Sequence, residues 1–331
     1  MENKTMPEMM PEPKSLQEAI VYFANHDNCI DYLAIRRWPN GRVLCPTCGS
    51  DKVKFHAERR IWQCSAHHSK RQFSIKVGTV MEDSAIPLDK WMTATWLVTN
   101  CKNGISSYEI ARDVKVTQKS AWFMLHRIRL AMQDETLGSK FSGEVEADET
   151  FIGGKARNMH KNVHARRITG GGRNTDDKIM VMGILERGGK VRTKIIADRK
   201  QKTLHSAVKE NVEVGTALFT DEFGAYKGLA SEYEHQIVDH ALRYVNGRVH
   251  TNGLENFWSL LKRGLSGTYV AVEPFHLFRY LDEQSFRYNN RATKTKPVSD
   301  SDRFDKAISN LVGKRLTFAQ LTGKEGAGTI N

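Results

Sequence analysis

The feature that most constrains this chain is a pair of cysteines, Cys45 and Cys48, separated by two residues. After 15 intervening residues comes Cys64, and two histidines, His67 and His68, follow shortly. Zinc takes four sulfur or imidazole ligands in a tetrahedron, often from two knuckles about 15 to 20 residues apart. The spacing therefore predicts one structural zinc ion held by the three cysteines and a histidine.

The sequence leaves the fourth ligand open, since either His67 or His68 can close the site, and we favour His68. The chain has five cysteines, an odd number of which three cluster, and this fits a reducing compartment better than a disulfide framework. A redox-active pair is the alternative interpretation, but no βαβ pattern surrounds it. With four protein ligands, we expect the zinc to stabilise the fold rather than to do chemistry.

The charge of the chain favours a polyanionic partner. The 331 residues carry a formal net charge of +12, and the isoelectric point is near 9.4, so DNA, RNA or anionic lipid would be attracted. There is no run of about 18 apolar residues, and we expect neither a membrane span nor a membrane partner. The polar N-terminus lacks the apolar core of a signal peptide, which predicts a cytoplasmic protein.

Hydrophobic patterns divide the chain into five segments. We expect a disordered tail at 1–14, and a helical lead-in with the zinc ribbon at 15–82, where short strands surround the cysteines. Residues 83–140 have helical periodicity, and 141–295 alternate strands and helices. Residues 296–331 form a polar C-terminal tail with one weakly amphipathic segment, FDKAISNLV. Strands that alternate with helices favour an α/β fold for the fourth segment.

A helix-turn-helix rhythm runs through residues 107–132. We expect Ser107 to cap the first helix and Thr117 to cap the second, with a short turn between them. Gln118 and Lys119 would then stand at the exposed start of the second helix, where a recognition helix meets base edges. The pattern predicts DNA contact by these side chains, and a plain helical hairpin is the alternative.

A Gly- and Arg-rich stretch lies between Gly153 and Lys178, after the first strand expected in the α/β segment. It is too polar to pack, and its composition fits a solvated linker as well as a loop that contacts DNA phosphates. The candidate phosphate contacts in it are Arg166, Arg167 and Arg173.

Three acidic residues lie where a metal site can form. Asp148 stands among apolar residues in one expected strand, and Asp221 ends the apolar run of another. A carboxylate on a central strand is costly to bury unless it is paired or binds a metal. Glu255 falls in the first turns of an expected helix, with Asn252 about one turn before it and Lys262 roughly two turns after it.

Two strand aspartates and a helix glutamate can converge and hold two Mg²⁺ or Mn²⁺ ions, which prefer oxygen ligands. Two such ions about 4 Å apart stabilise the attacking and leaving oxygens of phosphoryl transfer. Lys262, with Arg263 beside it, would stand near the phosphate and position DNA. Surface acids without a metal are the alternative interpretation.

Seven blocks between roughly residues 40 and 290 resemble one known family. They are CPTCG, WQC with RQFSIKVGTVMEDSAIPL, KWM, EVEADETFIGGK, FTDEFGAY, VHTNGLENFWSLLKRGLSGTYV and HLFRYLDEQSFRYNNR. Jointly they resemble DDE-type insertion-sequence transposases with an N-terminal zinc ribbon, bacterial relatives of the eukaryotic Merlin elements.

The resemblance implies an RNase-H-like catalytic domain that cleaves DNA and transfers strands, preceded here by the zinc ribbon and the helix-turn-helix. The matching triad is Asp148, Asp221 and Glu255. Because some related sequences have Asn in the third place, Asn252 competes with Glu255 as a metal ligand. The implied partners are terminal inverted repeats, target DNA and at least a second copy of the chain on DNA, within the nucleoid of a bacterium.

Two other functions are compatible with these residues. One is a DNA-binding regulator in which the RNase-H-like domain is inactive, and the other is a structure-selective nuclease that uses the same metals without strand transfer. Short terminal inverted repeats around the gene, with target duplications outside them, would favour the transposase.

Overall fold

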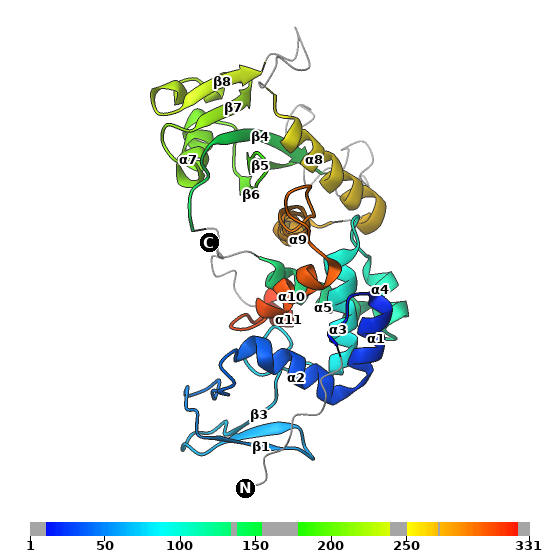
Figure 1. Cartoon of the computed structure of the whole chain (residues 1–331). Helices are drawn as coiled ribbons and strands as arrows, with labels where there is room; N and C mark the ends of the chain where they lie inside the picture. Colours follow the sequence, from blue (N-terminus) through cyan, green and yellow to red (C-terminus); the bar gives the residue numbers. More distant parts are fainter. Residues whose placement is uncertain (1–10, 134–137, 154–177, 239–249, 271, 324–331) are drawn as a thin grey trace. The chain divides into compact units, whose positions relative to one another are not determined.

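The computed structural model describes residues 11–133, 138–153, 178–238, 250–270 and 272–323. The chain forms two compact units, of which one comprises 1–133 with 290–331 and the other 134–289. In the sequence, the second unit is therefore inserted between two parts of the first, as the colours of Figure 1 allow the reader to follow.

The first unit begins with two helices and a small antiparallel sheet. The helices are α1 (Leu16–Ala24) and α2 (His26–Arg37). The strands are β1 (Val53–His56), β2 (Ile61–Cys64) and β3 (Gln72–Phe73), in the order β1-β2-β3. Trp62 packs between Trp38 and Phe73, with ring centroids 5.6 and 5.9 Å away, and gives this small ribbon an aromatic core.

Three helices follow: α3 (Leu88–Asn100), α4 (Ser107–Asp113) and α5 (Gln118–Met132). Thr117 caps α5 as expected, because its hydroxyl accepts the Ser120 N–H at 3.2 Å. The expectation that Ser107 caps α4 is wrong, because Ser106 does so. Glu109 stands three residues after Ser106, so the two residues exchange bonds of 2.8 and 3.2 Å in a capping box.

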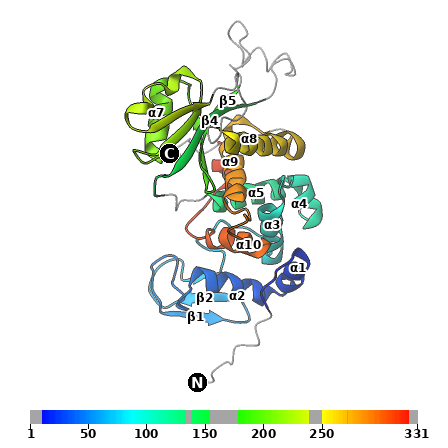
Figure 2. The same ribbon diagram turned by 45° about the horizontal axis from the view of Figure 1, so that its top comes forward.

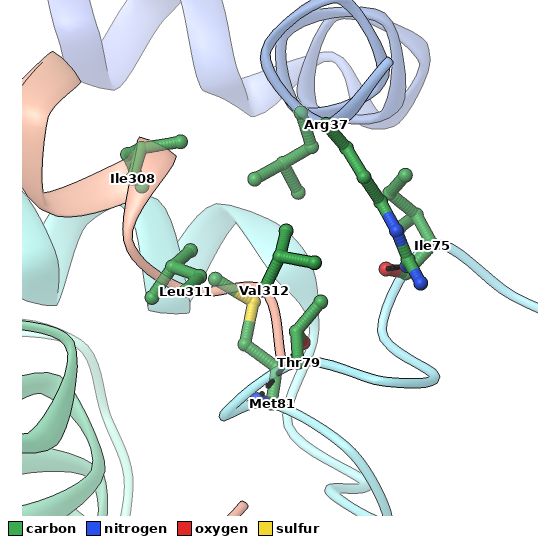
Figure 3. Close-up of a pocket in the computed structure, with 8 residues that line it drawn as sticks. Arg37, Ile75, Thr79, Met81, Ile308, Leu311 and Val312 are labelled. Atoms are coloured by element: carbon green, nitrogen blue, oxygen red, sulfur yellow. Dashed lines mark hydrogen bonds between the residues drawn. The ribbon is translucent and has the colours of Figure 1, made fainter. Parts of the chain in front are cut away.

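The C-terminal segment corrects the expectation of a polar tail at 296–331. It contains α10 (Asp300–Ser309) and α11 (Phe318–Leu321), and it belongs to the same unit as the N-terminal helices. Figure 3 shows Ile308 and Leu311 from this segment at a pocket that is also lined by Met81 and by Arg37 of α2. The weakly amphipathic segment expected here forms part of α10, and its apolar face is buried because it finds partners far away in the sequence.

Phe304 of α10 is the centre of this contact and provides a test of it. Its side chain is fully buried, and its ring lies 5.0 Å from that of Trp96 and 5.6 Å from that of Phe23. Phe304→Ala is expected to destabilise the first unit by about 3–5 kcal/mol, since the cavity removes these contacts. Urea denaturation measures this loss, with Ser309→Ala on the exposed end of α10 as the control. Equal stability of both variants would contradict the packing described here.

The second unit is built on a mixed sheet of five strands in the order β6-β5-β4-β7-β8. β5 pairs antiparallel with both β4 and β6, whereas β7 is parallel to β4 and to β8. The strands are β4 (Glu144–Ile152), β5 (Ile179–Glu186), β6 (Val191–Ile196), β7 (Ala217–Asp221) and β8 (Glu234–Val238). The expected α/β class is confirmed for this unit.

Helices cover both faces of the sheet. α7 (Gln201–Asn211) packs on one face, and α8 (Asn252–Gly264) and α9 (Leu277–Asn289) pack on the other. Figure 2 shows α7 and α8 on opposite sides of β4 and β5. On β5, Met182 and Ile184 face α7, whereas Val181 and Leu185 face α8, as strand alternation requires. The sheet therefore separates two hydrophobic cores.

Candidate functional site

Four candidate zinc ligands gather in the small ribbon of the first unit. The sulfur atoms of Cys45, Cys48 and Cys64 and a ring nitrogen of His68 all lie within 4.8 Å of one another. The sulfurs of Cys48 and Cys64 are 3.6 Å apart, and the Cys45 sulfur is 3.5 Å from Nε2 of His68. With Zn–S of about 2.3 Å and Zn–N of about 2.0 Å, tetrahedral ligand pairs stand about 3.5–3.8 Å apart. The donor set and its spacing therefore fit zinc.

Local structure brings these four side chains together. Residues 46–48 turn, Gly49 at a φ of 73° donates its N–H to the Cys45 carbonyl at 2.8 Å, and this turn presents the first two sulfurs. Cys64 ends β2, where its N–H donates to the Arg71 carbonyl at 2.8 Å. His67 is exposed and lies outside the cluster, so the geometry favours His68.

The acidic residues of β4 divide between the two faces of the sheet. Glu146 and Asp148 accept hydrogen bonds from α8, at 3.0 Å from the Leu254 N–H and at 2.9 Å from the Trp258 indole. Glu149 points to the opposite face, where the Tyr226 hydroxyl donates to it at 2.5 Å. Alternation along the strand thus separates Asp148, which the sequence singled out, from its neighbour.

Asp148 sits in an environment that disfavours its negative charge. Burial raises the pKa of its carboxyl to about 7, and the negative charges of Glu149 and Asp221 act in the same direction. The hydrogen bond from the Trp258 indole partly offsets this rise in pKa. Positive charge close to this half-buried carboxyl group would therefore be favourable.

Asp221 occupies the matching place on the next strand. The parallel pairing of β4 and β7 aligns Glu146 with Phe219, and Asp148 and Asp221 each lie two residues further along. Both therefore share one edge and one face of the sheet by the strand period. Asp221 ends β7, and its Oδ1 accepts the N–H of Phe223 at 3.1 Å, which leaves its other carboxylate oxygen outside this turn.

The third candidate ligand belongs to α8. Leu254, Phe257, Trp258 and Leu261 form the buried face of this helix, while Glu255 and Asn252 are exposed in its first turn and Lys262 and Arg263 in its last. Among the described residues, the cysteine–histidine cluster is the one group of three or more histidine, cysteine or acidic side chains close enough together to hold a metal ion. Asp148, Asp221 and Glu255 do not form such a group.

The candidate DNA contacts lie in three places. Gln118 begins α5, and its side-chain amide donates to the Ser107 hydroxyl at 2.9 Å. Lys119 is exposed, with its ammonium 4.9 Å from the ring centroid of Phe318. Lys262 and Arg263 are exposed at the end of α8. The other three, Arg166, Arg167 and Arg173, lie outside the described residues.

Sequence reasoning missed a buried network around Glu146, which is 1% exposed. Arg187 follows β5, and its Nε donates to this carboxylate at 2.9 Å. The same guanidinium donates to the carbonyl of His250, and His250 Nδ1 lies 3.5 Å from Glu146. The sequence held one indication of this network: the alternation of side chains along a strand places Glu146 on the same face as Asp148.

A second network that the sequence did not reveal lies on the other face of β4. Arg199 donates through Nε to Glu149 at 2.6 Å, and its guanidinium lies 3.8 Å from the ring centroid of Phe223. Phe223 and Tyr226 belong to the segment that follows Asp221. Through Tyr226 and Arg199, Glu149 therefore links the segment after Asp221 to the strand that carries Asp148.

Two known protein domains match parts of the chain, one in each unit. Residues 24–69 match the transposase zinc-ribbon domain, and residues 140–289 match the ISXO2-like transposase domain. Within the described residues, no helix has the length and apolar character needed to span a membrane.

Two curated relatives have descriptions that point the same way. A protein in transposable element ISH50 of Halobacterium salinarum is 29% identical over 253 residues, which cover 74% of this chain and 84% of the relative. A transposase-like protein of Haemophilus influenzae is 30% identical over 108 residues, which cover 32% of this chain and 87% of the relative. The chain therefore belongs to the family of ISXO2-like insertion-sequence transposases with an N-terminal zinc ribbon.

Proposed function

We propose that this protein is the transposase of an insertion sequence, which binds the terminal inverted repeats of its element and catalyses metal-dependent DNA cleavage and strand transfer. The observation that carries the proposal is the common strand register of Asp148 and Asp221 beneath α8, the helix of Glu255. A mixed sheet with helices on both faces is consistent with an RNase-H-like catalytic domain.

The chemistry of the donor set fits divalent cations. Asp148, Asp221 and Glu255 offer carboxylate oxygens, which Mg²⁺ and Mn²⁺ prefer. The pKa of Asp148 is raised by burial and by its acidic neighbours, so a bound cation would relieve unfavourable negative charge there. Two such ions, when bound, would stabilise the attacking and leaving oxygens of the phosphoryl transfer.

We assign the protein side chains separate roles. Asp148 and Asp221 bind metal from the sheet, and Glu255 binds it from the first turn of α8, with Asn252 as the competing ligand. Lys262, about two turns after Glu255 on the same helix, contacts a DNA phosphate near the scissile bond. Glu255 is preferred to Asn252 because a third carboxylate neutralises two divalent ions better than an amide does.

The ribbon is proposed to hold one structural zinc ion, with Cys45, Cys48, Cys64 and His68 as ligands. Four protein ligands leave no open position for a substrate, so this zinc would stabilise the fold of the ribbon. The net charge of +12 supports contact of the protein with DNA phosphates. We further propose that at least two copies of the chain act together on DNA.

Helix α5 is proposed to read the ends of the element. Changing Gln118 and Lys119 together to Ala is expected to reduce discrimination between terminal repeats and random DNA, by roughly 1–3 kcal/mol for each lost base contact. Competition binding at fixed salt measures this difference. Equal losses of affinity on both DNAs would instead indicate that α5 contacts only the sugar-phosphate backbone of DNA, or that it packs within the protein without touching bases.

The function is tested with purified full-length protein and DNA that carries the ends of its element. A transposase is expected to cleave at these ends in Mg²⁺ or Mn²⁺ and to join them to target DNA, while Ca²⁺ supports binding with little cleavage. A regulator would bind the same DNA without cutting it. A structure-selective nuclease would cut branched DNA whatever its end sequence, and would form no joined product.

A further inference from the structure

Helix α8 is attached to the sheet at two points. The Leu254 N–H donates to Glu146 at 3.0 Å, and the Trp258 indole N–H donates to Asp148 at 2.9 Å. Glu146 and Asp148 are two residues apart on β4 and share a face, because the strand period is two. Leu254 and Trp258 are four residues apart on α8 and also share a face. Both bonds therefore join the same two surfaces.

The spacing of the two bonds defines one register of the helix along the strand. Leu254 donates through its backbone and Trp258 through the indole of its side chain, and the two acceptors are two residues apart on the same strand. Sliding α8 along β4 by one residue would move both donors away from their carboxylates. The pair of bonds therefore determines the position of α8 along the strand.

Two glycines let α8 approach the sheet this closely. A Cβ atom on Gly183, which pairs with Asp148 across β4 and β5, would stand 2.6 Å from Cζ2 of Trp258. A Cβ atom on Gly253, the residue before Leu254, would stand 2.8 Å from Oε2 of Glu146. Side chains at either place would push α8 away from the sheet, since neither neighbour is a loose surface group.

Glu146 supplies the cap that α8 lacks from its own sequence. Thr251, the residue before the helix, makes no side-chain capping bond. The buried carboxylate of Glu146 accepts the Leu254 N–H instead, and negative charge is favourable at a helix N-terminus. Arg187 balances this buried charge with its bond of 2.9 Å. The first turn of α8 is thus held by a hydrogen bond to Glu146, whose charge is in turn balanced by Arg187.

We infer that Glu146 is a positioning residue for DNA cleavage. Its carboxylate caps α8 and, together with the bond between Trp258 and Asp148, sets where Glu255 stands relative to Asp148. Glu255 directly follows Leu254, so any shift of the first turn of α8 also shifts Glu255. The inference rests on the proposed function, because Glu146 acts through Glu255 and contacts no reacting atom.

Two substitutions at this position separate positioning from general stability. Glu146→Ala removes the acceptor of the Leu254 N–H and is expected to lower the single-turnover rate of end cleavage by roughly 100-fold, since small displacements of reacting groups have effects of this size. DNA affinity is expected to stay unchanged. Glu146→Gln keeps an oxygen acceptor and is expected to recover a large part of the rate.

Val208→Ala is the matched control for stability. Val208 is fully buried in the core on the α7 face of the sheet, whereas Glu146 contacts α8 on the other face. Both variants are compared at a temperature at which each is fully folded, as judged by its own melting curve. If Val208→Ala lost as much cleavage as Glu146→Ala, the effect at Glu146 would be general destabilisation and the inference would be overturned.

Hydrogen exchange distinguishes failure of this inference from failure of the proposed function. Glu146→Ala is expected to speed exchange of the backbone amides in the first turn of α8, and Val208→Ala is not. This measurement needs neither DNA nor metal. A wild-type protein that binds element-end DNA without cleaving it would overturn the proposed function, whereas wild-type exchange and wild-type cleavage in Glu146→Ala would overturn the positioning role alone.

Discussion

Asp148→Asn and Asp221→Asn are each expected to abolish Mg²⁺-dependent cleavage of element-end DNA. An amide keeps the shape of the side chain but removes the negative charge that two close divalent ions require. We expect each rate to fall by roughly 1000-fold or more, which corresponds to about 4 kcal/mol of activation free energy. Gel assays with end-labelled DNA measure cleavage, and DNA binding should remain nearly intact.

The control for these variants is Glu213→Gln. Glu213 is an exposed carboxylate that precedes β7, whereas Asp221 ends this strand. The control makes the same change of charge away from the proposed metal ligands and should cleave like the wild type. Robust cleavage by Asp148→Asn or by Asp221→Asn would remove that residue from the proposed metal site.

The third ligand is decided by two further variants. If Glu255 binds metal, Glu255→Gln is expected to abolish cleavage and Asn252→Ala only to slow it. The order would reverse if Asn252 were the ligand. Because both residues are exposed in the first turn of α8, neither substitution is expected to disturb the buried face of the helix. A robustly active Glu255→Gln protein would move the site back along α8.

Zinc removal is expected to have the largest effect on stability. Purified protein should contain about one zinc ion per chain, and a chelator or Cys48→Ser should unfold the ribbon. The ribbon has a sheet of three short strands and a small aromatic core, and structural zinc contributes about 10–16 kcal/mol of apparent binding free energy in comparable peptides. Elemental analysis and protease sensitivity within residues 40–75 measure both effects.

Cys101→Ser provides the control for the thiol change, because Cys101 lies outside the cluster. It should keep the metal and the folded ribbon. His68→Ala is expected to weaken zinc binding, whereas His67→Ala should leave it unchanged. A zinc-free wild-type protein whose folding did not respond to added zinc would refute the metal site.

Several features could be predicted because their signals are local. The spacing of Cys45, Cys48 and Cys64 indicated a metal cluster, since a knuckle presents its ligands within a few residues. The cap at Thr117 depends on the residues that directly follow it. The strands around Asp148 and Asp221 were also expected, because their apolar neighbours produce the pattern within a single element.

Other features required the folded chain. His67 and His68 are equivalent by spacing, and the direction in which the chain leaves β2 separates them, with His68 in the cluster. Residues 296–331 look polar by composition, yet Phe304 of this segment is fully buried among rings from α1, α2 and α3. Burial of one amphipathic helix depends on partners that no local pattern identifies.

The attachment of α8 shows the same division within the candidate site. The sequence by itself determined that Asp148 lies on a strand and that Glu255 lies in the first turns of a helix. Tertiary structure alone decided that Leu254 meets Glu146 and that Trp258 meets Asp148, across 108 and 110 residues of chain. Secondary structure follows from patterns a few residues long. Docking depends instead on close approach at Gly183 and Gly253, which are distant in sequence and both lie where α8 meets the sheet.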